Sequence, residues 1–498
     1  MSIPVPRVDP PVGRREVLTF AEKAHEELRR ALGRPRGAGE LLVLNVPAPI
    51  APVTALFDVL PEEPAVLWAP PEGAAVVGLG VAQEIDLAGE TRFAELRRKA
   101  ERVFGRLVVL GPAEAPRPHL YGGLAFAPGA AAGAAWREFS DGRFVLPRWR
   151  YLCERDRAWL SLILDDETDA AVVGAELDRW FGCLARYTAD TADTADMADD
   201  GRAGATGALR SGPSGPTIWQ KQVSEAEWGR LIDEVRGLIA AGQCSKIVAA
   251  RCARVHAGRA FQPREVLARL GASQSRCTRF AFRVQETTFL GATPERLVAR
   301  RGTRLLSEAL AGSIAAATPR GGSSEAMATP DKLLAEELLA SDKNRREHQL
   351  VVQAIVRALE PHCAWLDVPA TPQVRALRHV LHLHTPIVGE LADRAHVLTL
   401  VEALHPTPAV GGEPTRAALE WILGREPAAR GWYAAPVGWF DAAGDGEFAV
   451  ALRCGVLDGA EATIYAGAGI LLDSDAAAEY RETALKQRAL AAALGVEP

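Results

Sequence analysis

Charged residues recur at helical spacing near the C-terminus of this chain. Glu479, Glu482 and Lys486 lie three and four residues apart, and the same spacing continues to the alanines at 489 and 493. In a helix these positions share one face, so two carboxylates and a lysine adjoin a stripe that becomes apolar. A solvated helical turn also explains the pattern, because exposed Glu and Lys pairs contribute only about 0.3–0.5 kcal/mol. Both interpretations stay open from the spacing alone.

Two glycine-containing segments lie at the ends of expected strands. Ala466–Gly469 (AGAG) follows a strand-like run at Thr463–Tyr465, and its glycines would let the backbone come close to another group. A second expected strand, Arg304–Ala309, runs into LAGS, where Gly312 permits close approach and Ser313 offers a hydroxyl.

Three further charged residues lie in less usual surroundings. Lys246 falls in Cys244–Cys252, which is typical of a strand that is apolar on both faces. Burial lowers the pKa of a lysine, so Lys246 is either an edge residue that reaches solvent or a potential general base. Glu347 extends backward the apolar stripe of a helix expected at 341–359. Glu295 follows a proline at a strand end, where a plain surface acid is common.

Carboxylates from two helices could share one pocket. Glu347 and Glu482 lie on the inward faces of separate expected helices, and an inward carboxylate requires a cation. A lysine or an arginine could serve, and so could a metal ion. Mg²⁺ suits two such carboxylates because it keeps several of its waters.

The first part of the chain is rich in strands. After a charged helix expected at 14–34, short β-rich pieces recur from Glu40 to Leu164, separated by Pro, Gly and charged turns. The GLG at 78–80 lacks the full dinucleotide-binding pattern, so no cofactor role is assigned to it.

Composition divides the chain into three parts. Residues 1–187 form the strand-rich portion, and residues 188–215 are acidic and then Gly/Ser/Pro-rich, which predicts a disordered connector. Residues 216–498 carry the charged motifs described above. A capping box at Ser224 and Glu227 predicts a helix directly after the connector.

Charge and cysteine usage exclude several classes of function. The 498 residues carry a net charge of -6 without a basic patch, so no nucleic-acid partner is expected. Seven scattered cysteines without CxxC spacing favour reduced thiols over a zinc site or a disulfide framework. There is neither a signal-peptide core nor a run of about 18 apolar residues. A cytoplasmic protein without a membrane partner is expected.

Spaced motifs over residues 216–498 resemble those of the chorismate-binding enzymes, in particular the isochorismate-forming members. In order along the chain they are SKIVAAR, FLGATPERL, SEALAGS, SDKNRREHQLVV, HLHTPIVG, LHPTPAVGG, ALRCG, IYAGAGI and EYRETALK. The resemblance implies an α+β fold of two packed antiparallel sheets with helices outside, one active-site cleft, and Mg²⁺ dependence.

The resemblance also implies roles for individual residues. Lys246 matches the base that activates water for attack at C2 of chorismate, and Glu295 matches the acid that protonates the departing C4 hydroxyl. Such a pair suits this substitution, because each partner can contribute about 10²–10⁴ in rate. Glu347 and Glu482 match the Mg²⁺ ligands, with Glu479 bound through water.

Other matches imply substrate contacts. The groups that hold the enolpyruvyl carboxylate correspond to Arg453 and the backbone of Gly467, Ala468 and Gly469, and the remaining pocket residues correspond to Gly312, Ser313, His382, Ala409 and Lys486. Among the histidines of these motifs only His382 falls on a family position. We expect His379, His384 and His405 to be structural or surface histidines.

The residue type at position 409 differs between members of the family that form different products. Amine-forming and salicylate-forming members usually place Thr or Ser where this chain has Ala409, and alanine matches the isochorismate-forming members. The chain also lacks a GxCxG loop, so no glutamine amidotransferase partner is expected. We therefore expect a monomeric isomerase acting on chorismate, whose product could feed menaquinone, siderophore or salicylate formation. A salicylate synthase and a non-catalytic chorismate-binding protein are the alternatives.

Overall fold

The structure, a computed structural model, describes residues 14–194, 217–317 and 329–496. The N-terminal part contains more strands than helices. Its helices and strands are α1 (Arg14–Leu32), β1 (Leu41–Ala48), β2 (Ala65–Ala69), β3 (Ala75–Leu87), α2 (Arg92–Phe104), β4 (Leu107–Leu110), β5 (His119–Leu124), β6 (Gly142–Glu154), β7 (Arg157–Leu164) and α3 (Ala170–Thr194). Helix α3 continues into the segment predicted as a connector, and residues 195–215 of that segment lie outside the described residues.

The C-terminal part alternates strands with helices. Its first elements are β8 (Ile218–Lys221), α4 (Glu225–Ala240), β9 (Lys246–His256), α5 (Pro263–Ser273), β10 (Thr278–Val284), β11 (Thr287–Thr293), β12 (Arg296–Arg301), β13 (Arg304–Ala315), α6 (Thr329–Ala340) and α7 (Asp342–Leu359). The rest are β14 (Cys363–Asp367), β15 (Gln373–Ala376), β16 (Val380–Leu391), α8 (Val397–Leu404), β17 (Gly412–Glu413), α9 (Thr415–Arg425), β18 (Pro436–Asp441), β19 (Gly446–Val450), β20 (Cys454–Asp458), β21 (Glu461–Ile470) and α10 (Ala476–Leu494).

Local sequence signals account for several of these boundaries. The capping box before α4 is present, since the Ser224 side chain accepts from the Glu227 backbone and the Glu227 carboxylate accepts from that of Ser224. Ser341 caps α7 by a single bond, in which its side chain accepts from the backbone N–H of Asn344. The AGAG segment differs from expectation, because it lies inside β21 and not after it.

The strands join in one hydrogen-bonded network. The pairing is antiparallel throughout the described sheet except between β1 and β4. From one end to the other, the order is β8, β9, β21, β20, β11, β10, β2, β3, β6, β5, β18, β19, β12, β13 and β16. The N-terminal strands therefore lie in the middle of the network, and strands β9 and β21 lie near one end and β13 and β16 at the other.

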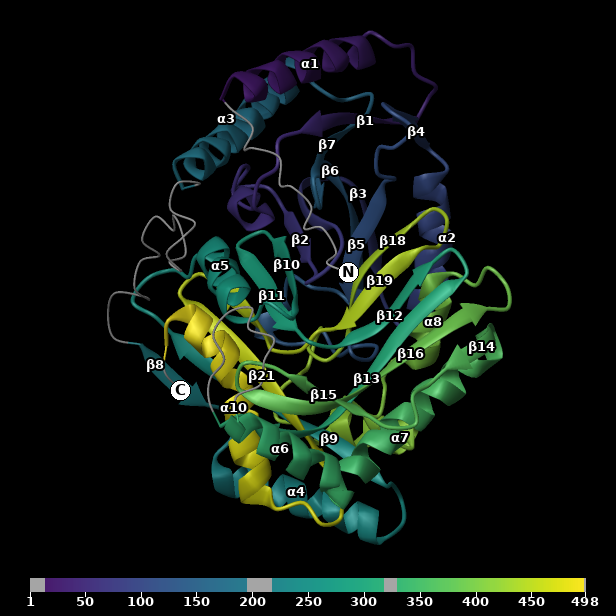
Figure 1. The fold of residues 1–498 in the computed structure, drawn as a ribbon, viewed down its shortest axis with the longest axis vertical. Coiled ribbons are helices and arrows are strands. Elements are labelled where there is room, and N and C mark those ends of the chain that lie inside the picture. The colour runs from purple at the N-terminus through teal and green to yellow at the C-terminus, as the bar shows by residue number, and fades with distance from the viewer. Residues whose placement is uncertain (1–13, 195–216, 318–328, 497–498) are drawn as a thin grey trace, which may run out of the picture.

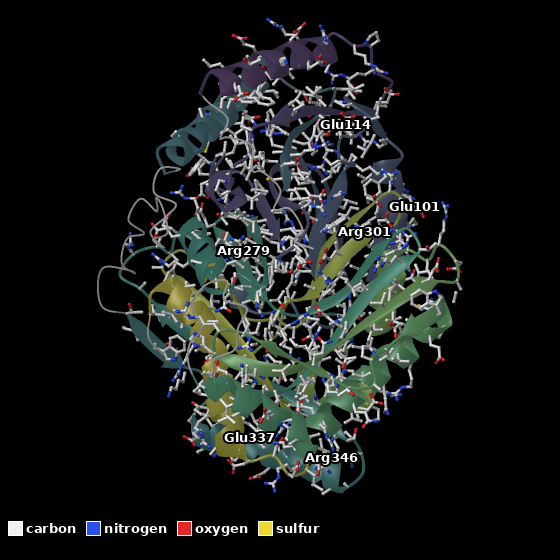
Figure 2. The ribbon with its side chains drawn as sticks, in the orientation of Figure 1. Glu101, Glu114, Arg279, Arg301, Glu337 and Arg346 are labelled. Atoms are coloured by element: carbon white, nitrogen blue, oxygen red, sulfur yellow. The ribbon has the colours of Figure 1, made fainter. Side chains whose placement is uncertain are left out.

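Helices cover the outside of this network. Figure 1 shows α1 and α3 side by side at one end of the molecule and α4, α6, α7 and α10 gathered at the opposite end. Figure 2 shows charged side chains such as Glu101 on α2 and Glu337 on α6, both of them solvent-exposed. The predicted α+β fold with helices outside is confirmed, with the refinement that the two sheets are continuous through shared strands.

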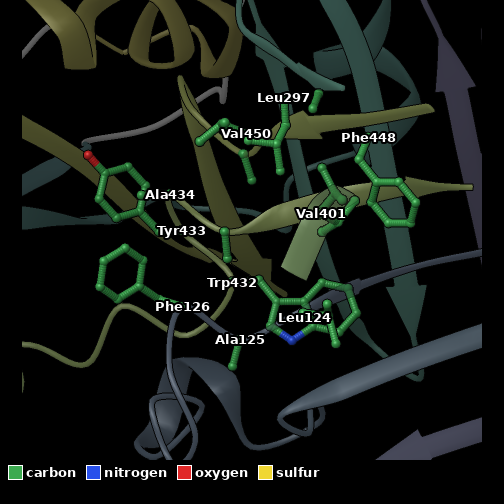
Figure 3. Close-up of a cluster of buried hydrophobic side chains, with 14 of the residues drawn as sticks. Leu124, Ala125, Phe126, Leu297, Val401, Trp432, Tyr433, Ala434, Phe448 and Val450 are labelled. Carbon is green, nitrogen blue, oxygen red and sulfur yellow. The ribbon is translucent and has the colours of Figure 1, made fainter. Parts of the chain in front are cut away.

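The larger hydrophobic core joins segments that are far apart in the chain. Figure 3 shows Leu124, Trp432, Tyr433 and Phe448 in one buried cluster. The Trp432 ring also packs edge-on against Phe282, with 5.6 Å between ring centroids. Burial of each large apolar side chain stabilises the fold by about 1.5–3 kcal/mol. This core thus holds the loop before β18 firmly against the sheet.

Two further features concern the helices and the cysteines. In the described ranges no helix combines the length and the apolar character that crossing a bilayer requires. All seven cysteines are free thiols, and five of them are buried.

Candidate active site

A cavity of about 210 Å³ lies between the two ends of the strand network. Its walls come from β9 and β21 on one side, β13 and β16 on the other, and the first turns of α7 and α10. Twelve residues predicted from the sequence line it: Glu295, Gly312, Ser313, Glu347, His382, Ala409, Arg453, Gly467, Gly469, Glu479, Glu482 and Lys486.

Lys246 is completely buried at the start of β9 and does not itself line the cavity. Its Nζ donates to Glu347 Oε1 at 2.8 Å, and Glu347 faces the cavity. The edge-lysine interpretation is therefore wrong. Gly469 explains the close fit, because a Cβ there would lie 2.6 Å from Glu347 Oε1 and 2.8 Å from Lys246 Cε. Any larger residue at Gly469 would push the ion pair apart.

Glu295 is the second buried group predicted to do chemistry. It lies between β11 and β12, and only 5% of its surface is exposed. Burial and then the nearby carboxylate of Glu308 raise the pKa of Glu295 to about 8, although Lys246 and Lys486 oppose the shift. The Glu295 side chain consequently carries its proton at neutral pH and can donate it.

Glu482 and Lys486 form an ion pair across one turn of α10. Lys486 Nζ lies 2.6 Å from Glu482 Oε1 and donates to the carbonyl oxygen of Gly467 at 2.9 Å. Ser313 donates its hydroxyl to the same Glu482 oxygen at 3.1 Å. Burial would raise the pKa of Glu482, but the charge and hydrogen bond of Lys486 lower it. The charged helix face predicted from spacing is therefore an inward face.

Arg453 and His382 lie next to each other on one wall of the cavity, where Arg453 is cationic and His382 is neutral. Arg453 follows β19 with a φ of +52°, and its Nη2 lies 3.3 Å from His382 Nε2. Burial, then the charges of Arg453 and Lys486, lower the pKa of His382 to about 3. Because His382 is neutral, it can accept the hydrogen bond from Arg453 and hold the guanidinium toward the cavity.

Gly312 shapes the opposite wall. Its φ is +74°, which favours glycine, and a bulge in the pairing of β13 with β16 lies between Ala311 and Ser313. A Cβ at Gly312 would lie 3.1 Å from the carbonyl oxygen of Asn344. Glycine thus lets β13 approach α7 and turns Ser313 toward Glu482.

Comparison with known proteins places this geometry in a family. The sequence matches the chorismate binding enzyme family over residues 29–495. The chain belongs to the chorismate-binding enzymes.

Individual relatives resemble most of the chain. A salicylate biosynthesis isochorismate synthase from Pseudomonas aeruginosa is 36% identical over 442 residues, covering 87% of this chain and 85% of the relative. Isochorismate synthase MenF from Bacillus subtilis is 33% identical over 441 residues, covering 86% of this chain and 88% of the relative. The solved structure of MenF, the menaquinone-specific isochorismate synthase from Escherichia coli, covers 96% of this chain and all of that chain, with a TM-score of 0.75 and 27% identity.

Ala468 lies between the two cavity-lining glycines of β21 in this chorismate-binding enzyme. Ala468 is fully buried in the hydrophobic core and does not line the cavity. Side chains alternate along a strand, so the Ala468 side chain points away from the face on which Gly467 and Gly469 open to the cavity. The predicted contact involves the backbone around Ala468 and not this methyl group, and it stays a prediction.

The sequence interpretation missed several residues that line the cavity. Lys343 Nζ lies 3.3 Å from Glu479 Oε1, and burial together with Glu482 raises the pKa of Glu479. Helical spacing held a usable signal, since Lys343 precedes Glu347 by four residues. Tyr433 and Tyr465, whose rings stack at 5.2 Å, had no such signal because they come from distant segments.

The carboxylates at the cavity are the candidate metal ligands. Over the described ranges no cluster of three or more His, Cys, Asp or Glu side chains is arranged to hold a metal ion. Instead Glu347, Glu479 and Glu482 each pair with a lysine. These oxygens nevertheless fit Mg²⁺, which commonly takes one or two protein carboxylates and completes its shell with waters and substrate oxygens.

Proposed function

We propose that this enzyme isomerises chorismate to isochorismate by adding water at C2 and removing the hydroxyl at C4. The observation that carries the proposal is the pairing of a buried amine, Lys246, with a carboxyl group, Glu295, that keeps its proton at neutral pH. Glu295 lines the cavity, and Lys246 lies directly behind the cavity-lining Glu347. Substitution of a hydroxyl by water needs a base and an acid together. The names of the relatives described above support the same reaction.

Each proton has an assigned place in the proposed reaction. Lys246, reacting as its neutral amine, accepts a proton from the water as that water attacks C2, and both ring double bonds shift. Glu295 gives its proton to the C4 hydroxyl, which leaves as water. One water enters and one leaves, so substrate and product are isomers. Return of a proton from Lys246 to Glu295 through solvent resets the site.

Cations around the cavity suit a substrate with two carboxylates. Arg453 and Lys486 lie on one wall, and Lys343 lies near the start of α7. Arginine can bind a carboxylate through two parallel hydrogen bonds, which fixes the orientation of the ligand. Ala409 on the lining offers no hydroxyl, as expected for isochorismate-forming members.

Mg²⁺ dependence is part of the proposal. Glu347 and Glu482 would hold the ion, and Glu479 would contact it through water. When bound, the ion would neutralise the ring carboxylate of the substrate. We expect titration calorimetry to detect Mg²⁺ binding to the wild type and a loss of most of that binding in Glu482→Ala. Normal binding by Glu482→Ala would remove Glu482 from the metal site.

Product analysis tests the reaction itself. Purified protein incubated with chorismate and Mg²⁺ should produce isochorismate as the main early product, with no stoichiometric pyruvate. Salicylate plus pyruvate as the main early products would replace the isomerase with a lyase. Absence of any turnover would leave only binding, and the assignment of an isomerase would be wrong.

A further inference from the structure

A second group of charged residues lies behind Glu295. Glu308 on β13 is 7% exposed, and its Oε2 lies 2.6 Å from Arg375 Nη2 on β15. The same oxygen lies 2.7 Å from Nε2 of His384 on β16. None of these three residues lines the cavity. Their three strands are adjacent only because the sheet pairs β16 with both β13 and β15.

This group contacts the backbone on both sides of Glu295. Arg375 Nη1 donates to the carbonyl oxygen of Pro294 at 3.0 Å, and the backbone N–H of Arg296 donates to Glu308 Oε1 at 3.1 Å. The residues immediately before and after Glu295 are therefore held by one ion pair. Glu295 gains a fixed position without direct contact to that pair.

Among the described residues, the charges that act most strongly on the pKa of Glu295 are one anion and three cations. Glu308 is the anion, and Lys246, Lys486 and Arg375 are the cations. Burial would raise the pKa of Glu308, but hydrogen bonds from His384 and Arg375 and the charge of Arg375 lower it to about 2. Glu308 is thus ionised at any working pH and opposes ionisation of Glu295.

We infer that Glu308 is a positioning residue that anchors the segment 294–296 and supplies the fixed negative charge that keeps Glu295 protonated for transfer to the leaving hydroxyl. The inference rests on the proposed function, since it assumes that Glu295 is the acid. It assigns no contact with substrate to Glu308, which acts only through Glu295.

Removing the charge of Glu308 should move the pH dependence of turnover. Glu308→Gln keeps the shape of the side chain. It removes the negative charge that repels ionised Glu295, and it leaves Arg375 without its counter-charge. All of these changes favour ionised Glu295. The alkaline limb of kcat should therefore move to lower pH by on the order of one unit. The KM for chorismate should change little, because Glu308 does not line the cavity.

The opposite shift is expected when the partner is removed. Arg375→Gln takes away a cation that favours ionised Glu295, so the alkaline limb should move to higher pH. General loosening of the site could lower kcat in both variants, but it would not displace the limb in opposite directions. This contrast separates an electrostatic role from a merely structural one.

Two controls complete the experiment. Glu447 on β19 is another buried carboxylate, paired with Arg296 Nε at 3.0 Å, and it is not among the charges that face Glu295. Glu447→Gln should leave the limb where it is in the wild type. Glu308→Asp keeps the charge, so its limb should remain closer to the wild-type position than that of Glu308→Gln.

Each outcome has one consequence. A folded Glu308→Gln with the wild-type limb overturns the role of Glu308. If Glu308→Gln does not fold, an unmoved limb in Arg375→Gln overturns it instead. Full turnover by Glu295→Gln has a different meaning, because it removes the acid from the proposed function. An inactive Glu295→Gln together with an unmoved limb in Glu308→Gln leaves the acid in place and removes only Glu308.

Discussion

Two ion pairs that both contact strand β9 differ in how many of their polar atoms form hydrogen bonds within the protein. Lys246 and Glu347 meet at 2.8 Å with 0% and 16% of their side chains exposed. Arg430 and Glu426 meet at 2.5 Å with 3% of each side chain exposed. Strand β9 contacts both pairs, since it contains Lys246 and its Val248 carbonyl oxygen accepts from Arg430.

The Arg430 pair is saturated. Its guanidinium makes two hydrogen bonds to Glu426 and donates to the carbonyl oxygens of Val410 and Val248 at 2.7 and 2.8 Å. The backbone N–H of Ala250 donates to Glu426 at 2.8 Å. An ion pair whose donors and acceptors are satisfied inside the protein serves the fold.

The Lys246 pair is open on one side. Its hydrogen bond to Glu347 joins a buried lysine side chain to a carboxylate that faces the cavity. Substrate, water or a metal ion can therefore exchange with this pair without disturbing the core. The two pairs show that a polar group left accessible at a cavity, rather than burial alone, distinguishes the functional ion pair from the structural one.

The largest expected effect comes from removing the open pair's lysine. Lys246→Met should reduce kcat by about 10²–10⁴, because none of the other lysines in the described ranges is buried and could replace the base. Unfolding in urea should change less than turnover, since Glu347 can be hydrated from the cavity. The control is Arg254→Met, an exposed residue of the same strand, which should keep full turnover. Wild-type kcat in Lys246→Met would contradict the proposed base.

Breaking the saturated pair should instead affect stability. Arg430→Met leaves Glu426 buried without its partner, which should lower the free energy of unfolding by about 3–5 kcal/mol. Urea denaturation measures the loss, and kcat of the folded protein should stay near the wild-type value. The matched control is Arg425→Met, whose exposed pair with Glu234 should contribute at most about 1 kcal/mol. Loss of turnover at unchanged stability would show that Arg430 serves catalysis and not the stability of the fold.

Crowding the open pair should give an intermediate effect. Gly469→Ala places a methyl group against Glu347 and Lys246, and such overpacking typically costs about 1–3 kcal/mol. We expect lower kcat together with a lower midpoint in urea. Gly237→Ala in α4, where a Cβ meets nothing within 4 Å, should stabilise by up to about 1 kcal/mol and leave kcat unchanged. Equal behaviour of the two variants would show that the pair tolerates displacement.

The pH dependence of kcat and of stability tests the protonation of Glu295 at the cavity. Since the pKa of Glu295 is raised to about 8, kcat should fall about tenfold per unit at pH values above it. The raised value also means that the protonated form stabilises the fold fully below the ordinary value of 4.5 and loses this contribution as pH rises toward about 8. Wild-type stability should therefore decline relative to Glu295→Gln between these values, as measured by urea denaturation. A constant difference would contradict the raised pKa.

The sequence determined the local features of this protein. Capping residues, turn glycines and the alternation of apolar residues predicted the N-terminal strands and helices α4, α7 and α10, because these signals act between residues close in the chain. Helical spacing placed Glu479, Glu482 and Lys486 on one face. The motifs of the chorismate-binding enzymes supplied the remaining candidate residues and the expected chemistry.

Only the tertiary structure decided which side chains face the cavity and how their charges are matched. Burial of Lys246 depends on strands β17 and β21, which pair with β9, and the pKa of Glu295 depends on Glu308 from another strand. Ala468 faces the core because of strand alternation within β21, which AGAG alone did not reveal. Solvation and Coulomb interactions depend on distances in space, and strands far apart in the chain set those distances here.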